Sequence, residues 1–354
     1  MPRALIVGGT GAIGRASARR LLASGWEVTV TGRDPHRLPA DIAAAGGAFA
    51  AAERDDPARL RTALGEGADL LVDCLCFTAT HAATLLPLAR DAGSTVMISS
   101  KAVYVDGAGS HSNSDVAPRF DGPITEAQAT VAPGDADHTT REGYGANKVA
   151  AEQLLLDSGL PVTVLRPSKI HGSGSSMPRE WVFVKRVLDR RPAIFLARRG
   201  TGVDHPSAAA NIAALIEVVA AAPGTRILNI ADPDAPSGLE ISRAIATELG
   251  HAWEEVLLDE DAGETLGRHP WDAPHPIVLD TTAALALGYE PVGDYAATVA
   301  DEVDWLVGAA SGGEDAHRLP GLDDPSFAPL LDYTLEDRYL AARGGHNGVG
   351  LEPS

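Results

Sequence analysis

The sequence predicts an α/β protein built on a doubly wound parallel sheet, with a smaller C-terminal lobe. Three observations indicate this class. Short apolar runs without polar alternation recur in the first half of the chain, helical patterns lie between them, and the composition shifts after about residue 172. The 354 residues, of which 45% are hydrophobic, suffice for one large α/β domain and a smaller one.

The first strand and helix enclose a glycine-rich turn. An apolar strand at residues 4–7 leads into the turn, and a helix follows from Arg15 to Leu22. Glycine suits this turn because a Cβ would forbid the backbone angles, keep a pyrophosphate at a distance and separate the helix from the strand. The N–H groups at the start of the helix are free to bind phosphates. We therefore predict a dinucleotide site formed by Gly8, Gly11, Ala12, Ile13 and Gly14.

The second strand, residues 26–31, is followed by a turn that favours NADP(H) as the cofactor. In NAD-binding units this strand usually ends in an acidic residue that accepts hydrogen bonds from the ribose hydroxyls and would repel a 2′-phosphate. Gly32 takes that position, and Arg33 follows it. We expect Arg33 to pair with the 2′-phosphate and Arg37 to be a second partner, with NAD(H) the less favoured cofactor. The alternative for both arginines is an exposed surface charge.

The third, fourth and fifth strands are expected at residues 48–52, 69–76 and 94–100. Glu53 follows the third strand, where an acidic side chain could meet the adenine amino group of the cofactor. Cys74 and Cys76 lie in the fourth apolar run, and in a reducing cytosol we expect small packed side chains rather than a disulfide or half of a metal site. The eleven histidines show no ligand spacing, so no metal site is predicted.

The residues that could carry chemistry follow the fifth strand. The stretch from Lys101 to Arg141 is polar and rich in Gly, Asp and Ser, which predicts a long loop over the cleft. Tyr144 and Lys148 then lie four residues apart on a helical pattern, so their polar ends share one face. Tyrosine has an unperturbed pKa of about 10, and a nearby ammonium and an oxidised nicotinamide would stabilise its phenolate. Ser100 would orient a substrate oxygen while the tyrosine passes the proton.

The second half of the chain begins with a sixth strand at residues 161–165 and continues with short elements between proline- and glycine-bearing turns. This pattern predicts a substrate-covering lobe with elements at 181–188, 193–196, 211–221 and 239–249, whereas 226–230 returns to the sheet. The predicted division is a dinucleotide-binding domain at 1–172 with 222–232, a substrate lobe at 173–310 and a C-terminal arm or tail at 311–354.

The formal net charge of −19 bears on the partners of the protein. It argues against nucleic acid, whose phosphates the protein would repel, and against anionic membrane surfaces. No apolar run reaches the length of a membrane span, and no basic segment with an apolar core precedes the first strand. We therefore expect a cytoplasmic protein whose partner is a small-molecule substrate, with a homodimer as an option.

These residues carry a resemblance to a known family. Its motifs occur in order as Gly8-x-x-Gly11-x-x-Gly14, Ser100 four residues before Tyr104, Tyr144-x-x-x-Lys148, and Arg166-Pro167. Over roughly residues 3–305 the sequence resembles the extended short-chain dehydrogenases/reductases of the NAD-dependent epimerase/dehydratase family. The resemblance implies a Rossmann-like fold and makes Ser100, Tyr144 and Lys148 the catalytic positions. The cofactor would also contact Cys74, Leu75, Cys76, Lys148 and Pro167.

The sequence departs from the family pattern on the substrate side. Lys169 stands where the family has an asparagine, and His171 where it has a tyrosine. Nucleotide-sugar members often carry an arginine four residues before a histidine, and Thr201 takes that place before His205. The candidate substrate residues are Lys101, Lys169, His171 and His205.

Three functions are compatible with these residues. The first is an NADP(H)-dependent oxidoreductase that interconverts a carbonyl and a secondary alcohol on a small polar metabolite. The second is a nucleotide-sugar epimerase or dehydratase that takes a hydride onto the cofactor and returns it within one cycle. The third, a non-catalytic NADP(H)-binding protein, is disfavoured by the intact Ser100, Tyr144 and Lys148.

Overall fold

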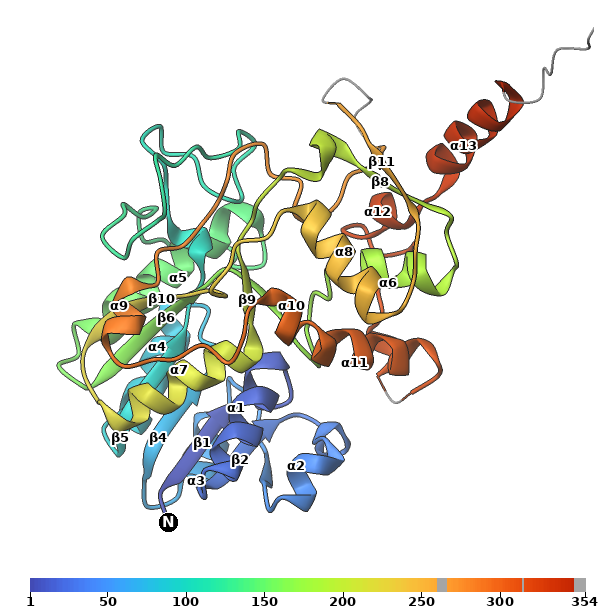
Figure 1. The fold of residues 1–354 in the computed structure, drawn as a ribbon. Coiled ribbons are helices and arrows are strands. Elements are labelled where there is room, and N and C mark those ends of the chain that lie inside the picture. The colour runs from blue at the N-terminus through green and yellow to red at the C-terminus, as the bar shows by residue number, and fades with distance from the viewer. Residues whose placement is uncertain (260–265, 314, 347–354) are drawn as a thin grey trace, which may run out of the picture.

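The computed structural model describes residues 1–259, 266–313 and 315–346, and a parallel sheet forms its centre (Figure 1). Seven strands follow the order β10-β6-β5-β4-β1-β2-β3, which confirms the predicted doubly wound, Rossmann-like architecture. The strands are β1 (Arg3–Val7), β2 (Glu27–Gly32), β3 (Ala48–Ala51), β4 (Ala68–Asp73), β5 (Ala92–Ile98), β6 (Val162–Pro167) and β10 (Arg226–Ile230). The apolar runs predicted these strands because both faces of the sheet are buried.

Helices cover both faces of the sheet (Figure 1). Successive strand residues point to opposite faces, so Ile6 of β1 packs with α1 and α7, whereas Leu5 packs with α3, α4 and α5. The helices of these two layers are α1 (Ala12–Ala23), α2 (Ala40–Ala44), α3 (Pro57–Leu64), α4 (Ala79–Ala89), α5 (Arg141–Leu156), α7 (Ala209–Ala221) and α9 (Thr282–Ala286). Two short 3-10 helices, η1 (Pro35–Arg37) and η2 (Lys101–Val103), follow β2 and β5.

Helix α7 differs from the sequence-based expectation. The pattern at 211–221 predicts a helix of the lobe, but Ile212, Leu215 and Val219 join the core that lies between α1 and the sheet. Ser94 of β5 also donates a hydrogen bond to the carbonyl of Val219 (3.3 Å). Apolar spacing identifies a helix but does not show which apolar surface the helix covers.

A second, smaller core builds the C-terminal lobe. It includes Trp181, Phe183, Trp271 and Tyr295, and the rings of Phe183 and Trp271 stack at 5.8 Å. The elements of the lobe are α6 (Trp181–Leu188), β8 (Ala193–Leu196), η3 (Ala197–Gly200), α8 (Gly238–Glu248), β11 (Glu254–Leu257), α10 (Tyr295–Thr298) and α11 (Ala300–Ala310). A parallel pair, β7 (Lys169–His171) and β9 (Pro206–Ala208), connects the sheet region to this lobe.

The C-terminal arm packs on the rest of the molecule. Its elements are η4 (Ala316–Arg318), α12 (Ala328–Leu331) and α13 (Thr334–His346). Asp315 accepts hydrogen bonds from Arg15 at the start of α1 (3.2 Å) and from Trp305 (2.8 Å), and Phe327 and Leu331 enter the core of the lobe. The arm therefore connects the lobe to the glycine turn. Residues 347–354 of the predicted arm lie outside the described residues.

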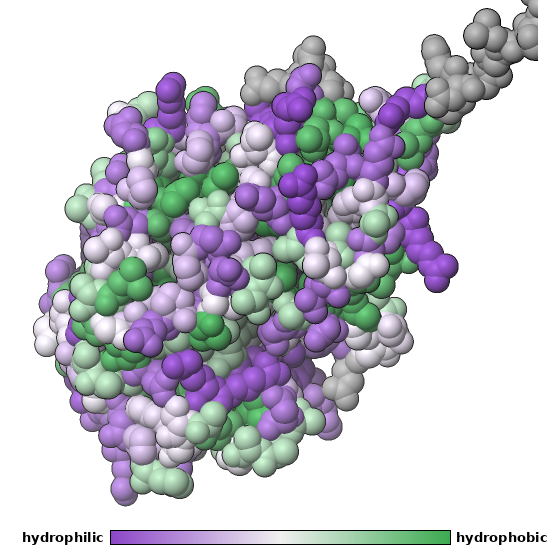
Figure 2. Space-filling model, viewed as in Figure 1, coloured by the Kyte–Doolittle hydropathy of each residue, from purple (hydrophilic) through white to green (hydrophobic). Residues whose placement is uncertain are grey.

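The surface is mixed in polarity. Hydrophilic and hydrophobic residues are interspersed on the face drawn in Figure 2. The large apolar side chains that are exposed, such as Val116, Val292 and Leu322, come from separate segments, which is ordinary for a folded protein. Within the described ranges, no helix combines the length and the apolar character that a membrane span needs.

A buried polar network joins α5 to the edge of the sheet. Arg166 of β6 donates to Glu152 of α5, with a separation of 3.0 Å at Nε, and Ser99 donates to the same carboxylate. The Arg166 guanidinium lies 4.8 Å from the ring centre of Tyr104, whose hydroxyl donates to Asn229 of β10 (2.6 Å). Burial raises the pKa of Tyr104 to about 12. The network therefore fixes α5 relative to β6 and β10.

Breaking this network should destabilise the fold. Arg166→Met leaves the Glu152 carboxylate buried without its cation, which is expected to lower the free energy of unfolding by about 3–5 kcal/mol. Urea unfolding followed by circular dichroism measures the change. Arg20→Met is the matched control, because the Arg20–Glu217 pair is partly exposed and should contribute less than about 1 kcal/mol. Equal losses in the two variants would contradict the structural role of the buried pair.

Candidate active site

The glycine turn has the close contacts that its sequence predicts. Gly8 has a φ of +81°, and a Cβ on it would lie 2.7 Å from Cγ of Leu75. A Cβ on Gly14 would overlap the backbone of Gly9. These two positions therefore need glycine, one for its backbone angle and one for the approach of α1 to the turn.

Helix α1 begins directly beyond the turn. Gly11 is its N-cap and donates its N–H to the carbonyl of Gly8 (3.3 Å). Ala12 and Ile13 form the first turn of the helix and are buried. The first N–H groups of a helix lack partners within the helix, so this end is suited to a phosphate.

Arginines gather beyond the end of β2. Arg33 is exposed and forms no ion pair with any described residue. Arg37 in η1 is half-buried, and its Nε has no hydrogen-bond partner in the described part of the chain. Burial lowers the pKa of Arg318 against the opposing effect of Asp315, and the charges of Arg15 and Arg37 lower it further. Arg318 has no local signal in the sequence, because the arm brings it to this end of the sheet from far along the chain.

Lys148 is held at the carboxyl ends of two sheet segments. Its side chain is 1% exposed, and its ammonium donates to the carbonyls of Cys76 (2.9 Å) and Ile98 (2.8 Å). The same ammonium lies 4.3 Å from the ring centre of Phe77. An ammonium has three donors, so these two carbonyls leave one N–H for another partner.

Tyr144 lies one turn before Lys148 on α5, with its ring centre 5.9 Å from the lysine ammonium. Gly145 brings this part of α5 against the segment that follows β5, because a Cβ there would lie 2.8 Å from the carbonyl oxygen of Ala102. Ser100 caps that segment, and its Oγ accepts from the N–H of Ala102 (3.1 Å). Ser100, Tyr144 and Lys148 therefore meet at one edge of the sheet.

The cysteines lie in the turn beyond β4, which ends at Asp73, and not on the strand as expected. Cys74 donates its N–H to the carbonyl of Val7 (3.0 Å), and Leu75 is 36% exposed beside the glycine turn. Burial raises the pKa of Cys76 to about 12, and neither cysteine forms a disulfide. Cys76 is buried and Cys74 is half-buried, so both thiols lie within the packed turn.

Two further residues assigned to the cofactor can be located. Glu53 is exposed directly after β3, and Pro167 is the last residue of β6, where it is paired in register with Ile230. Both lie at the carboxyl edge of the sheet, as ligand-binding residues of this architecture do.

Two lysines contact one carboxylate close to Ser100, and the charge of Arg179 acts on both lysines. Lys101 contacts Asp204, and Lys169 reaches the other oxygen of the same carboxylate at 3.2 Å. Burial lowers the pKa of Lys101, and the charges of Lys169 and Arg179 lower it further. Burial also lowers the pKa of Lys169, with Arg179 again contributing. The sequence analysis missed Asp204, since nothing in its local sequence indicates a pair with residues on β7 and η2.

The two histidines assigned to the substrate have other partners. His205 accepts from the N–H of Leu279 at Nδ1 (3.1 Å) and contacts the carbonyls of Asp232 and Asp234 at Nε2 (2.9 Å each). Both ring nitrogens are thus engaged by backbone groups, so His205 joins three loops and neither nitrogen is left for a substrate. His171 is buried, and its Nε2 contacts Asp232 (2.9 Å).

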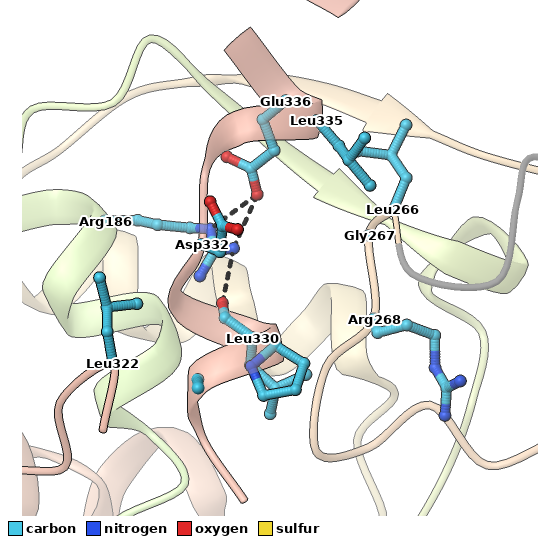
Figure 3. Close-up of a pocket in the computed structure, with 11 residues that line it drawn as sticks. Arg186, Leu266, Gly267, Arg268, Leu322, Leu330, Asp332, Leu335 and Glu336 are labelled. Atoms are coloured by element: carbon cyan, nitrogen blue, oxygen red, sulfur yellow. Dashed lines mark hydrogen bonds and ion pairs between the residues drawn. The ribbon is translucent and has the colours of Figure 1, made fainter. Parts of the chain in front are cut away.

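A separate hollow of about 490 Å³ lies between the lobe and the C-terminal arm (Figure 3). Arg186 lies at its wall, but it donates to Glu336 (2.7 Å) and to the carbonyl of Leu330 (3.0 Å). None of the candidate catalytic residues lines this hollow. Ser100, Tyr144 and Lys148 lie instead at the edge of the main sheet.

Comparison with known proteins identifies the family of the chain. The sequence profile of the NAD dependent epimerase/dehydratase family matches residues 4–202, which is more than half of the chain. A comparison with curated proteins gave no significant match.

Solved structures share the fold at low sequence identity. A dTDP-glucose 4,6-dehydratase from Bacillus anthracis, in complex with NAD, is 16% identical with a TM-score of 0.66, and the match covers 89% of this chain and 99% of the dehydratase. A UDP-glucose-4-epimerase from Stenotrophomonas maltophila, with bound NAD and formylated UDP-arabinopyranose, is 19% identical with a TM-score of 0.67, covering 88% and 100%. A UDP-glucose 4-epimerase from Thermus thermophilus is 19% identical with a TM-score of 0.62, covering 87% and 99%.

Proposed function

Because the chain belongs to the NAD dependent epimerase/dehydratase family, we propose that it is a nicotinamide-dependent oxidoreductase. It would interconvert a carbonyl and a secondary alcohol on a small anionic metabolite. The observation that carries the proposal is the meeting of Ser100, Tyr144 and Lys148 beside the glycine turn. The turn fits a dinucleotide, since a Cβ on the N-cap residue Gly11 would meet only the carbonyl oxygen of Gly8 at 3.8 Å, which leaves room for a phosphate at the start of α1. When bound, the nicotinamide would supply or accept the hydride.

The protein residues would manage the proton and the orientation of the substrate. Ser100 would donate a hydrogen bond from Oγ to the substrate oxygen. In the reducing direction, Tyr144 would transfer its hydroxyl proton to that oxygen, and in the oxidising direction it would take the proton back. The free N–H of Lys148 would point to the tyrosine or to a cofactor ribose, and its positive charge would stabilise the phenolate.

The cations near Ser100 support an anionic substrate. Asp204 can neutralise one of the two lysines, and a carboxylate or phosphate on the substrate would pair with the other and oppose the burial that lowers the pKa of both. Buried charges of one sign without partners are strongly unfavourable, so such a group would be bound with a large electrostatic gain.

The arginines beyond β2 support NADP(H). Gly32 has no side-chain carboxylate that would repel a 2′-phosphate of the cofactor. Arg33 and the unpartnered Nε of Arg37 could bind this phosphate. The relatives of known structure cited above were solved with NAD, so the phosphate preference rests on these two arginines.

The same cations also favour a second candidate function. A nucleotide-sugar pyrophosphate carries two charges that need cationic partners, and Lys101, Lys169 and Arg179 could supply them. The enzyme would then be an epimerase or dehydratase with an internally recycled cofactor. A non-catalytic NADP(H)-binding protein is disfavoured by the arrangement of Ser100, Tyr144 and Lys148.

The first prediction from the proposed function concerns the proton donor. Tyr144→Phe removes only the hydroxyl, so kcat should fall about 100-fold or more while the Kd for the cofactor changes little. Steady-state kinetics and fluorescence titration of the cofactor measure the two quantities. Tyr339→Phe is the matched control, because this tyrosine packs on Phe195 in the lobe, and its kcat should equal that of the wild type. A near-normal kcat for Tyr144→Phe would sink the mechanism.

The second prediction concerns the cofactor. Arg33→Ala and Arg37→Ala should each weaken NADP(H) binding by about one to two orders of magnitude and leave NAD(H) binding nearly unchanged, because only NADP(H) carries the 2′-phosphate. Calorimetric titrations with both cofactors measure this. Arg59→Ala is the control, since Arg59 is exposed and paired with Asp56 on α3. The assignment fails if the wild type binds both cofactors equally.

The third prediction separates the two candidate functions. UDP-, GDP- and dTDP-sugars should not raise the Tm of the NADP-bound protein and should not be converted to products. A small anionic ketone or alcohol should raise the Tm and should be converted, with net consumption or formation of NADPH. Lys169→Met should raise KM for that substrate more than it lowers kcat, because the lysine holds the anion and not the reacting carbon. Sub-millimolar binding of a nucleotide sugar that is lost in Lys169→Met would favour the epimerase or dehydratase.

A further inference from the structure

Three buried side chains converge where the sheet region meets the lobe. His171 belongs to β7, Glu180 directly precedes α6, and Glu302 belongs to α11. One ligand atom from each of them lies within 4.8 Å of the others. The three residues are 1%, 1% and 0% exposed, respectively. This cluster takes no part in the redox chemistry proposed above.

Each member presents an atom without a partner. Nδ1 of His171, Oε2 of Glu180 and Oε1 of Glu302 are buried and accept or donate no hydrogen bond within the described residues. The other polar atom of each side chain is held in place. Glu302 accepts the N–H of Gly172 (2.6 Å), and Glu180 accepts the hydroxyl of Tyr295 (3.3 Å). The three side chains are thus held in place, and each has one nitrogen or oxygen atom whose lone pair is free to bind a ligand.

A fourth residue fixes the imidazole from the opposite side. Asp232 contacts Nε2 of His171 (2.9 Å), and its second oxygen accepts from Ala208 (2.6 Å) and Asn211 (2.8 Å). A histidine that binds a metal commonly donates its other nitrogen to a carboxylate in this way, which fixes the tautomer and leaves the metal-facing nitrogen deprotonated.

The charges of this region match a divalent cation. Glu180, Glu302 and Asp232 are three buried carboxylates, and the charges of Arg179 and Lys169 act on Glu180 from the side of the lysines. A dication between Glu180 and Glu302 would add positive charge where two carboxylate oxygens have no partner. Without the ion, the two glutamates would face each other with unpartnered oxygens in a site shielded from water.

We propose that His171, Glu180 and Glu302 bind one divalent transition-metal ion, with Asp232 orienting the histidine. One imidazole and two carboxylates suit Zn²⁺ or Mn²⁺. Bonds of about 2.0–2.2 Å place two ligand atoms of one ion about 3–4 Å apart, so small movements would complete the site. The ion would join β7, α6 and α11 and so stabilise the junction between the sheet and the lobe. The ligands are far apart in the sequence, which is why ligand spacing predicts no metal.

The experiment uses the full chain purified without a histidine tag. The protein is unfolded with chelator, refolded with Zn²⁺, with Mn²⁺ or without metal, and freed of loose ions. Mass spectrometry of the bound metal should give about one equivalent for one of the two ions, and that ion should raise Tm. If the protein retains less than a tenth of an equivalent of each of the two ions, the proposal is overturned. The two glutamates would then share a proton in place of a metal ion.

Variants locate the ion. Glu302→Gln and Glu180→Gln preserve shape and hydrogen-bonding capacity, and each should lower metal affinity about 10-fold or more. Glu255→Gln is the matched control, because Glu255 pairs with Arg243 on the lobe surface and should retain full binding. The electron paramagnetic resonance spectrum of protein-bound Mn²⁺ should change in the first two variants only. Unchanged affinity and spectrum in both of them would overturn the proposal, since the ion would then lie elsewhere.

Discussion

The ammonium of Lys148 is the interaction on which the arrangement of the site depends. It is a buried charge whose hydrogen bonds go to two main-chain carbonyls, those of Cys76 and Ile98, at the ends of neighbouring sheet segments. Both carbonyls belong to the sheet region, so the bonds fix the height of α5 above it. Tyr144 is one helical turn away on the same helix, so these bonds also fix its position relative to the sheet. The network of Arg166, Glu152 and Tyr104 fixes the other end of the same helix.

Much of the fold and the catalytic edge could be predicted because their signals are local in sequence. Apolar runs, the glycine turn and the spacing of Tyr144 and Lys148 each report a physical requirement of neighbouring residues. Contacts between distant segments gave no such signal. Asp204 between the lysines, Arg318 beside the arginines and the convergence of Glu180 with Glu302 depend on how the lobe and the arm fold back. His205 could not be recognised as structural because its partners are backbone groups.

The positive groups of the site act against a strongly negative molecule. The net charge of −19 would repel anions at long range, but at physiological ionic strength such fields decay within about 8 Å. Contacts of a ligand with Arg33, Arg37, Lys101 and Lys169 would act at shorter distances, and the last three side chains are partly shielded from water. Affinity for an anionic ligand would therefore come from direct pairing, and the global charge would mainly slow its approach at low salt.

The place of β10 in the sheet has a consequence for how the chain is made. β10 covers the outer edge of β6, yet the ribosome delivers it only after α6, β8, β9 and α7. Until then β6 presents a row of unpaired backbone groups flanked by apolar side chains, the kind of edge to which other unfinished chains can add. A chain that stopped at residue 202, where the family profile ends, would keep that edge permanently. The nascent protein is therefore prone to aggregate from the time β6 is made until residues 226–230 emerge and pair with β6.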